Sequence, residues 1–78
     1  MIPARTALLG LLDRRKEGAS VCPSEVARQI GGPEWRDRMP AVHAAVDELV
    51  GEGRIALSWK GKPMVRRSGP YRISVPQG

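Results

Sequence analysis

The chain of 78 residues contains no phenylalanine, one cysteine and one histidine. A single cysteine, Cys22, cannot form an internal disulfide, so nothing in the sequence indicates an oxidising compartment. A single histidine, His43, leaves little from which to build a metal site or a histidine-based catalytic dyad. The sequence does not combine a nucleophile, a base or metal ligands in the pattern of a catalytic site. We therefore expect no catalysis, no cofactor and no small-molecule substrate.

Acidic residues are also missing, but from only one part of the chain. Residues 1–52 carry seven Lys or Arg against eight Asp or Glu, whereas residues 53–78 carry six Lys or Arg and no acid. The net charge of +5 is therefore the sum of −1 for residues 1–52 and +6 for residues 53–78. So uneven a distribution indicates an anionic partner, nucleic acid above all. A membrane surface fits less well, because the basic stretch lacks the apolar helical face that interfacial binding needs.

Long apolar runs are absent. The run ALLGLL, at residues 7–12, is far too short to span a bilayer. It also differs from a secretory signal, because basic residues follow it and no small-residue cleavage site comes next. We therefore expect a cytoplasmic protein with no membrane contact. At this length we expect one domain, residues 1–78, whose small core supplies only about 3–5 kcal/mol of net stability.

The first part of the chain predicts two helices. The first spans residues 3–17, with leucines on one face and cations in the last turn, and stops at Gly18. The stretch ASV at residues 19–21 is a short extended piece at most. The second helix is capped by Cys22, spans barely two turns and stops at the glycine pair 31–32.

A third helix is predicted to begin at Pro40. Pro33 allows one helical turn through Trp35, but Pro40 disfavours helix at the preceding residue and lacks the N–H that an uninterrupted helix needs. We therefore expect a break there and a helix from Pro40 to about Glu52. Its inward residues recur at helical spacing: Val42, Val46, Leu49 and Val50.

Two alternating stretches, RIALSW at residues 54–59 and YRISV at 71–75, predict an antiparallel hairpin. One face of the first stretch carries its three largest apolar residues: Ile55, Leu57 and Trp59. The basic loop between the strands, residues 60–70, is longer than the usual two to five residues. The predicted fold is mainly α with a small antiparallel β hairpin, in the element order of a winged helix-turn-helix domain. In such domains the third helix usually reads the major groove, and the hairpin loop is the wing.

The motifs VCPSEVAR, WRDRMPAV, EGRI, KGKP and GPYRI follow one another in this order within residues 7–75. Together they resemble a family of small bacterial proteins catalogued only as a domain of unknown function. The resemblance is fairly specific, because uncommon residues recur at fixed spacing: Cys22, Pro23, Trp35 and Pro40. It implies a bacterial cytosolic protein with a compact helical and winged core, and it transfers no activity and no site residues.

Cys22 has a reactive and a structural interpretation. A thiol at a helix N-terminus is stabilised as a thiolate by the helix dipole. The structural interpretation is stronger, because Cys22 stands where Ser or Thr usually caps and Pro23 takes the first helical position. Glu25 can then bond the Cys22 amide, as in a capping box.

The aromatic residues are few, namely Trp35, Trp59 and Tyr71. We expect them to anchor the small core, because stacking on bases would need several aromatics on one open face. His43 is expected to flank the apolar face of the third helix, with a phosphate contact as the lesser alternative.

The third helix carries few side chains that could distinguish bases. Its predicted outward face holds alanines and acids: Ala41, Ala44, Ala45, Asp47, Glu48 and Glu52. Alanine offers no bidentate hydrogen bond to a base, and carboxylates repel phosphates. Only Arg36 and Arg38, just before the helix, supply cations near its N-terminal end. Base-specific readout is therefore not expected.

These features favour a nucleic-acid-binding winged helix that contacts phosphates through a basic wing, with little base-specific readout. The candidate contacts are basic residues of the wing, the strands and the start of the third helix: Lys60, Lys62, Arg66, Arg67, Arg54, Arg72, Arg36 and Arg38. The alternative is a protein interaction module, or an accessory domain of a larger enzyme. It would pack the Ala-rich, acidic third helix on a protein partner.

Overall fold

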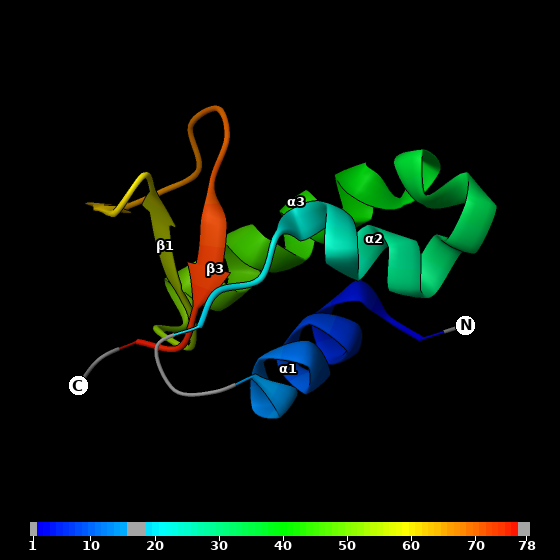
Figure 1. The fold of residues 1–78 in the computed structure, drawn as a ribbon, viewed down its shortest axis with the longest axis horizontal. Coiled ribbons are helices and arrows are strands. Elements are labelled where there is room, and N and C mark those ends of the chain that lie inside the picture. The colour runs from blue at the N-terminus through cyan, green and yellow to red at the C-terminus, as the bar shows by residue number, and fades with distance from the viewer. Residues whose placement is uncertain (1, 16–18, 77–78) are drawn as a thin grey trace.

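The computed structural model of the chain describes residues 2–15 and 19–76. The elements follow in the order α1 (Ala4–Arg14), α2 (Pro23–Gly31), the 3₁₀ turn η1 (Gly32–Glu34), α3 (Trp35–Gly51), β1 (Ala56–Trp59), β2 (Lys62–Met64) and β3 (Arg72–Ser74). The described chain is mainly helical with a small antiparallel sheet, which confirms the coarse prediction. In Figure 1 the sheet lies toward one end of the molecule, and α1 lies below α2.

Helix α1 is shorter than predicted. Pro3 is its N-cap, and the helix ends at Arg14 because Arg15 already adopts an extended conformation, with φ −89° and ψ 152°. The predicted stop at Gly18 lies outside the described residues. Leu8 and Leu12 are buried, so the predicted apolar face is confirmed.

Helix α2 has the start and the cap that the sequence predicts. Cys22 is the N-cap, and the Glu25 carboxylate accepts a hydrogen bond from the Cys22 N–H at 3.2 Å. Val26 faces inward and is fully buried. The helix ends at Gly31, and Gly32 follows with φ 55°, a conformation that favours glycine. The local chemistry of this segment therefore sets both of its ends.

Helix α3 is continuous through Pro40, so the predicted break is wrong. Pro40 is the sixth residue of the helix and removes one backbone hydrogen bond, the one that its N–H would have donated to Arg36. Proline costs about 3 kcal/mol in a helix interior. Burial on both sides offsets this cost, because Met39 packs against the core and Val42 is fully buried.

The inward face of α3 also differs by one position. Ala45, predicted to point outward, is buried, whereas Val50 is only half-buried. The buried residues of the helix are Val42, Ala45, Val46 and Leu49. Both sets fit a stripe of period 3.6, so the periodicity alone could not place the stripe, and contact with the core decides which of Ala45 and Val50 is buried.

The C-terminal part forms three strands rather than two, in the order β2-β1-β3. The predicted single loop of residues 60–70 is wrong, because its first part turns at Lys60 and Gly61 and returns as β2. Both turn residues have positive φ, 51° and 80°, the combination that matches the twist of a tight hairpin. The two predicted strands are also shorter than expected, at residues 56–59 and 72–74.

The short extended piece before α2 is confirmed. Val21 forms a bridge with Ile73, whose carbonyl accepts the Val21 N–H at 2.7 Å and whose N–H donates to the Val21 carbonyl at 2.9 Å. The segment before α2 is thereby joined to β3, which fixes the start of α2 against the sheet.

The core lies between the three helices and the sheet. Its buried apolar residues come from every α-helix and from the strands: Ala7, Leu8, Leu12, Val21, Val26, Ala27, Val42, Val46, Leu49, Ile55, Leu57, Tyr71 and Ile73. Tyr71 is thus a core residue as predicted, and Trp35 packs partly against the core. Trp59 does not belong to the core, because its side chain is 40% exposed. It lies on the predicted face of β1, but that end of the sheet faces a hollow instead of a packed helix.

Candidate functional site

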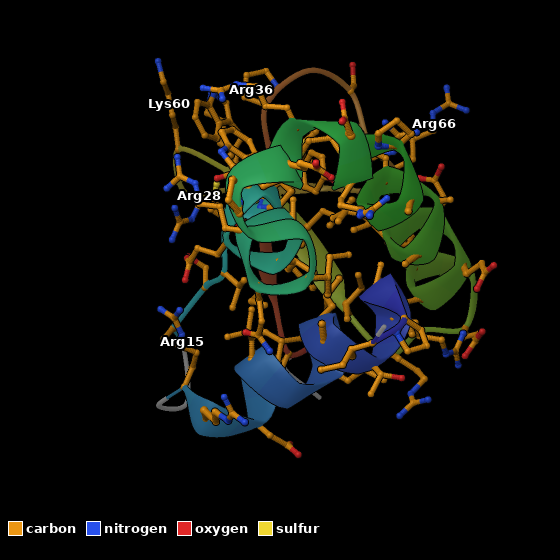
Figure 2. The ribbon with its side chains drawn as sticks, turned by 90° about the vertical axis from the view of Figure 1, so that its right-hand side faces the viewer. Arg15, Arg28, Arg36, Lys60 and Arg66 are labelled. Carbon is orange, nitrogen blue, oxygen red and sulfur yellow. The ribbon has the colours of Figure 1, made fainter. Side chains whose placement is uncertain are left out.

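The basic stretch at residues 60–67 does not form one patch. Lys60 lies in the β1–β2 turn, and Lys62 begins β2, whereas Arg66 and Arg67 lie in the loop that follows β2. Figure 2 shows Lys60 and Arg66 on opposite sides of the molecule. The hairpin reverses the chain within the stretch, so cations that are close in sequence reach different faces.

Arginines contact three carboxylates at the C-terminal end of α3, those of Asp47, Glu48 and Glu52. Arg67 donates to the two carboxylate oxygens of Asp47 at 2.8 and 3.0 Å. Arg5 of α1 donates to both oxygens of Glu52 at 2.6 Å and lies 3.6 Å from Glu48. The hydrogen bonds from Arg67 and Arg5 lower the pKa of Asp47 and of Glu52, respectively. We call these five residues the paired side.

A second group of cations is held by an aromatic ring. The guanidinium carbons of Arg28, on α2, and Arg36, on α3, lie 4.7 and 4.4 Å from the centroid of the Trp35 ring. The indole attracts both cations and holds two like charges close together. Figure 2 shows Arg28 and Arg36 on the same side of the molecule as Lys60. We call Arg28, Arg36 and Lys60 the cationic face.

No ion pair with a carboxylate engages the cationic face within residues 2–15 and 19–76. Arg36 and Lys60 are among the contacts predicted from the sequence, whereas Arg28 is not. The contact between Arg28 and Trp35 joins α2 to α3 across η1, and no periodicity of either helix indicates it.

The three remaining predicted contacts have different environments. Arg54 is exposed beyond the end of α3. Arg38 is half-buried against Gly31, where even a Cβ atom would come within 2.6 Å of the Arg38 Cγ. Arg72 donates to the Ser20 hydroxyl at 3.0 Å and to the Ser20 carbonyl at 3.3 Å. Arg72 therefore helps to fasten the segment before α2 to β3.

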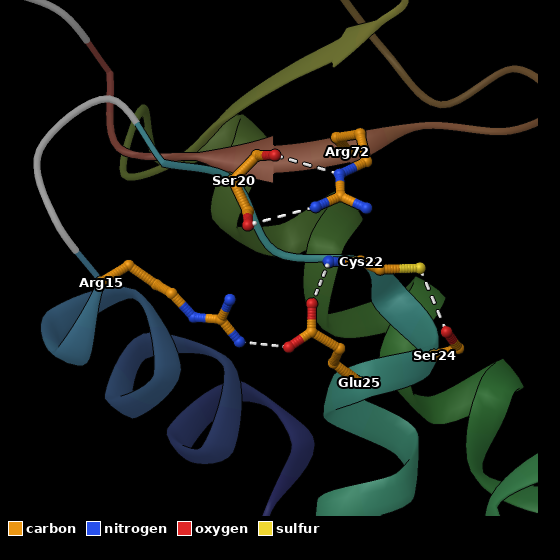
Figure 3. A network of polar contacts seen from close by, with 6 residues as sticks. All are labelled: Arg15, Ser20, Cys22, Ser24, Glu25 and Arg72. Carbon is orange, nitrogen blue, oxygen red and sulfur yellow. Dashed lines mark hydrogen bonds and ion pairs between the residues drawn. The ribbon is translucent and has the colours of Figure 1, made fainter.

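The start of α2 lies in a network of polar contacts that Figure 3 shows. Arg15 pairs with the Glu25 carboxylate, which also accepts the Cys22 N–H. The Cys22 Sγ lies 3.0 Å from the Ser24 hydroxyl. Burial acts to raise the pKa of the Cys22 thiol, but hydrogen bonds with Ser24 and the charge of Arg72 bring the pKa below its usual value. The predicted cap of α2 is confirmed, and Cys22 is its N-cap residue.

A hollow of about 360 Å³ opens between the N-terminus of α2, α3 and the sheet. Trp59, Met39 and Pro23 supply much of its apolar lining. Deeper in the lining, the His43 Nδ1 lies 2.7 Å from the Tyr71 hydroxyl oxygen, at hydrogen-bond distance. Burial lowers the pKa of His43 and raises the pKa of Tyr71 to about 12, so both groups are neutral at neutral pH. The hollow therefore combines an apolar lining with the neutral His43–Tyr71 pair and the guanidinium of Arg72.

Residues 3–76 match the model of a family described as a protein of unknown function, DUF3253. The chain belongs to this family. The match confirms the resemblance found in the sequence motifs and covers nearly the whole chain. No curated protein matches it.

The described part of this DUF3253 chain contains no group of three or more His, Cys, Asp or Glu side chains that could hold a metal ion. In the same residues, no helix has both the length and the apolar character that crossing a membrane requires.

Proposed function

We propose that this protein is a winged helix-turn-helix module that binds nucleic acid in the cytoplasm, mainly through phosphate contacts. Helices α2 and α3 are separated by the three residues of η1, which is the turn length of a helix-turn-helix unit. The sheet follows α3, and the loop between β2 and β3 projects from the molecule in Figure 1, in the place of a wing. The module acts by binding rather than by catalysis.

The observation that carries this proposal is the cationic face. Arg28 and Arg36 stack on Trp35 and need no carboxylate to hold them in place. Guanidinium groups fixed in this way lose little side-chain freedom when they meet a phosphate. Exposed Lys60 and Lys62 extend the positive charge to the β1–β2 hairpin. A phosphate backbone supplies the anions that this arrangement lacks.

The contacts are proposed to position the nucleic acid rather than to read its sequence. The exposed residues along α3 include Asp37, Ala41, Ala44 and Glu48. These side chains offer no bidentate donors for base edges, and the carboxylates repel phosphates. Binding should therefore depend weakly on sequence and strongly on salt.

A salt titration of binding to a duplex of random sequence tests the proposal. If Arg28, Arg36, Lys60 and Lys62 each meet one phosphate, log K falls against log salt with a slope of about −3.6. Between 50 and 200 mM salt this slope corresponds to a loss of roughly 150-fold. Absence of binding at 50 mM salt to duplex DNA, duplex RNA and single strands would refute the proposal.

A second candidate is a protein interaction module. Ala41 and Ala44 are exposed one turn apart on α3, so a partner helix could approach this face closely. Replacing Ala44 with Arg would block such an approach. If Ala44→Arg abolished a protein contact and the salt titration showed no nucleic-acid binding, this second function would replace the first.

A further inference from the structure

Trp59 is a large apolar side chain that the fold leaves partly uncovered. It ends β1, 40% of its surface is exposed, and it lines a hollow of about 360 Å³. Sites for small molecules occupy roughly 300–1,000 Å³, so the hollow is large enough for one small group. Met39, Pro23 and Pro70 contribute further apolar surface. An indole wall with an apolar lining suits a flat aromatic ring.

The charges around Trp59 indicate which chemical groups the aromatic ring of the ligand should carry. Lys62 is the direct cross-strand partner of Trp59, so both side chains lie on one face of the sheet. Lys60 follows Trp59 in the turn. Arg72 also lines the hollow and uses only two of its five N–H groups on Ser20.

None of the described residues that line the hollow carries a carboxylate. Aromatic surface bordered by cations alone is the arrangement with which proteins hold single-stranded nucleic acid, with the base stacked and the phosphates neutralised. An apolar side chain from a protein partner could use the aromatic wall, but it would leave the lysines without anions.

We propose that this hollow receives one unpaired nucleobase stacked on Trp59, with the flanking phosphates at Lys60 and Lys62. The inference rests on the proposed function and adds its substrate class, namely single strands, loops or frayed ends. A paired base inside a duplex cannot enter, because its faces are covered by neighbouring base pairs. The Ser24 hydroxyl, which lines the hollow, can bond the edge of the base.

The test compares three nucleic acids of equal length: oligothymidine, the same backbone with abasic sites, and a duplex. Base stacking on an aromatic residue is worth about five- to 150-fold in affinity. Oligothymidine should therefore bind more tightly than the abasic strand by that factor. Trp59→Ala should remove the difference, and Trp59→Phe should retain most of it. Val65→Ala is the matched control, because Val65 is 91% exposed and does not line the hollow.

A direct measurement on a protein with an intact hollow guards against misfolding of Trp59→Ala. The tryptophan fluorescence of wild type should be quenched by oligothymidine but not by the abasic strand, and Trp59→Phe, which keeps Trp35 with Arg28 and Arg36, should lose this quenching. Equal affinity for the two strands with no quenching would overturn the inference while leaving phosphate binding in place. Quenching of the Trp59 fluorescence by an acidic, aromatic peptide but not by oligothymidine would also overturn the inference. Failure of all three nucleic acids to bind at low salt would refute the proposed function itself.

Discussion

The cationic face and the paired side hold their arginines in opposite ways. On the paired side, Asp47 bonds Arg67 through both carboxylate oxygens. On the cationic face, Arg28 and Arg36 share the ring of Trp35 and pair with no carboxylate of the described residues. The difference shows that the number of cations in a stretch of sequence is a poor guide to the charge it offers a ligand. An arginine that is held by a carboxylate is already paired with an anion, whereas an arginine that is held by an aromatic ring can still bind one.

The largest expected effect concerns Tyr71, the buried phenol beside the paired side. Its pKa is raised from 10.0 to about 12, so the unfolded chain loses this proton at lower pH than the folded protein does. The contribution of the protonated Tyr71 phenol to the free energy of unfolding is therefore fully present well below pH 10, and it is lost as the pH rises toward 12. The total loss is about 3 kcal/mol, because one pKa unit corresponds to 1.36 kcal/mol.

Urea unfolding at a series of pH values between about 8 and 12 measures this loss. Tyr71→Phe has no phenol to titrate, so its stability should decline less steeply than that of wild type above about pH 10. If the two profiles ran parallel, the alkaline loss would have to come from other groups.

A second prediction compares the two regions directly. Replacing Arg28 and Arg36 with Gln should flatten the salt slope by about 1.8, since each phosphate contact contributes about 0.9. Wild type should then lose about 12-fold more affinity than this variant between 50 and 200 mM salt. The matched control replaces Arg5 and Arg67 with Gln. These arginines already bond carboxylates, so the slope should hardly change. A larger change in the control than in the test variant would reverse the comparison.

A smaller effect tests whether Cys22 serves structure rather than reactivity. Cys22→Ala should cost about 1 kcal/mol, because the capping box loses its side-chain half and keeps only the bond from the Cys22 N–H to Glu25, whereas Cys22→Ser should leave the melting temperature nearly unchanged. Thermal unfolding of the two variants measures both values. A rate of reaction with a disulfide reagent far above that of free cysteine at neutral pH would instead support a redox role.

The smallest predicted effect comes from releasing Arg67. Asp47→Asn removes the charge that holds its guanidinium, and a released Arg67 can add one phosphate contact. The salt slope should become steeper by up to about 0.9, which corresponds to about 3.5-fold between 50 and 200 mM salt. An unchanged slope, measured by the same titration, would mean that Arg67 points away from the bound nucleic acid.

The parts of the fold that depend on local chemistry could be predicted. The cap at Cys22 and the end of α2 at Gly31 follow from residues within one or two turns of each other. The continuity of α3 through Pro40 could not be predicted, because it depends on burial against segments distant in sequence. The turn at Lys60 was also missed, since lysine rarely adopts positive φ.

The candidate site shows the same limit. Lys60 and Arg36 were selected from the sequence because exposed cations near a turn or a helix start need no tertiary contact to be noticed. The pairing of Arg67 with Asp47 joins residues 20 positions apart, and no pattern in the sequence reports it. The exposure of Trp59 likewise depends on the hollow beside it, which exists only once α2 and α3 are placed against the sheet.

The outer position of β2 has a consequence for association between copies of the protein. An unprotected edge strand can pair with another chain and start aggregation. Strand β2 has only three residues, begins with the charged Lys62 and continues with Pro63, which has no N–H to donate. These features discourage a second copy from adding a strand there. Substitution of Lys62 by an apolar residue should therefore lower the concentration at which the protein precipitates.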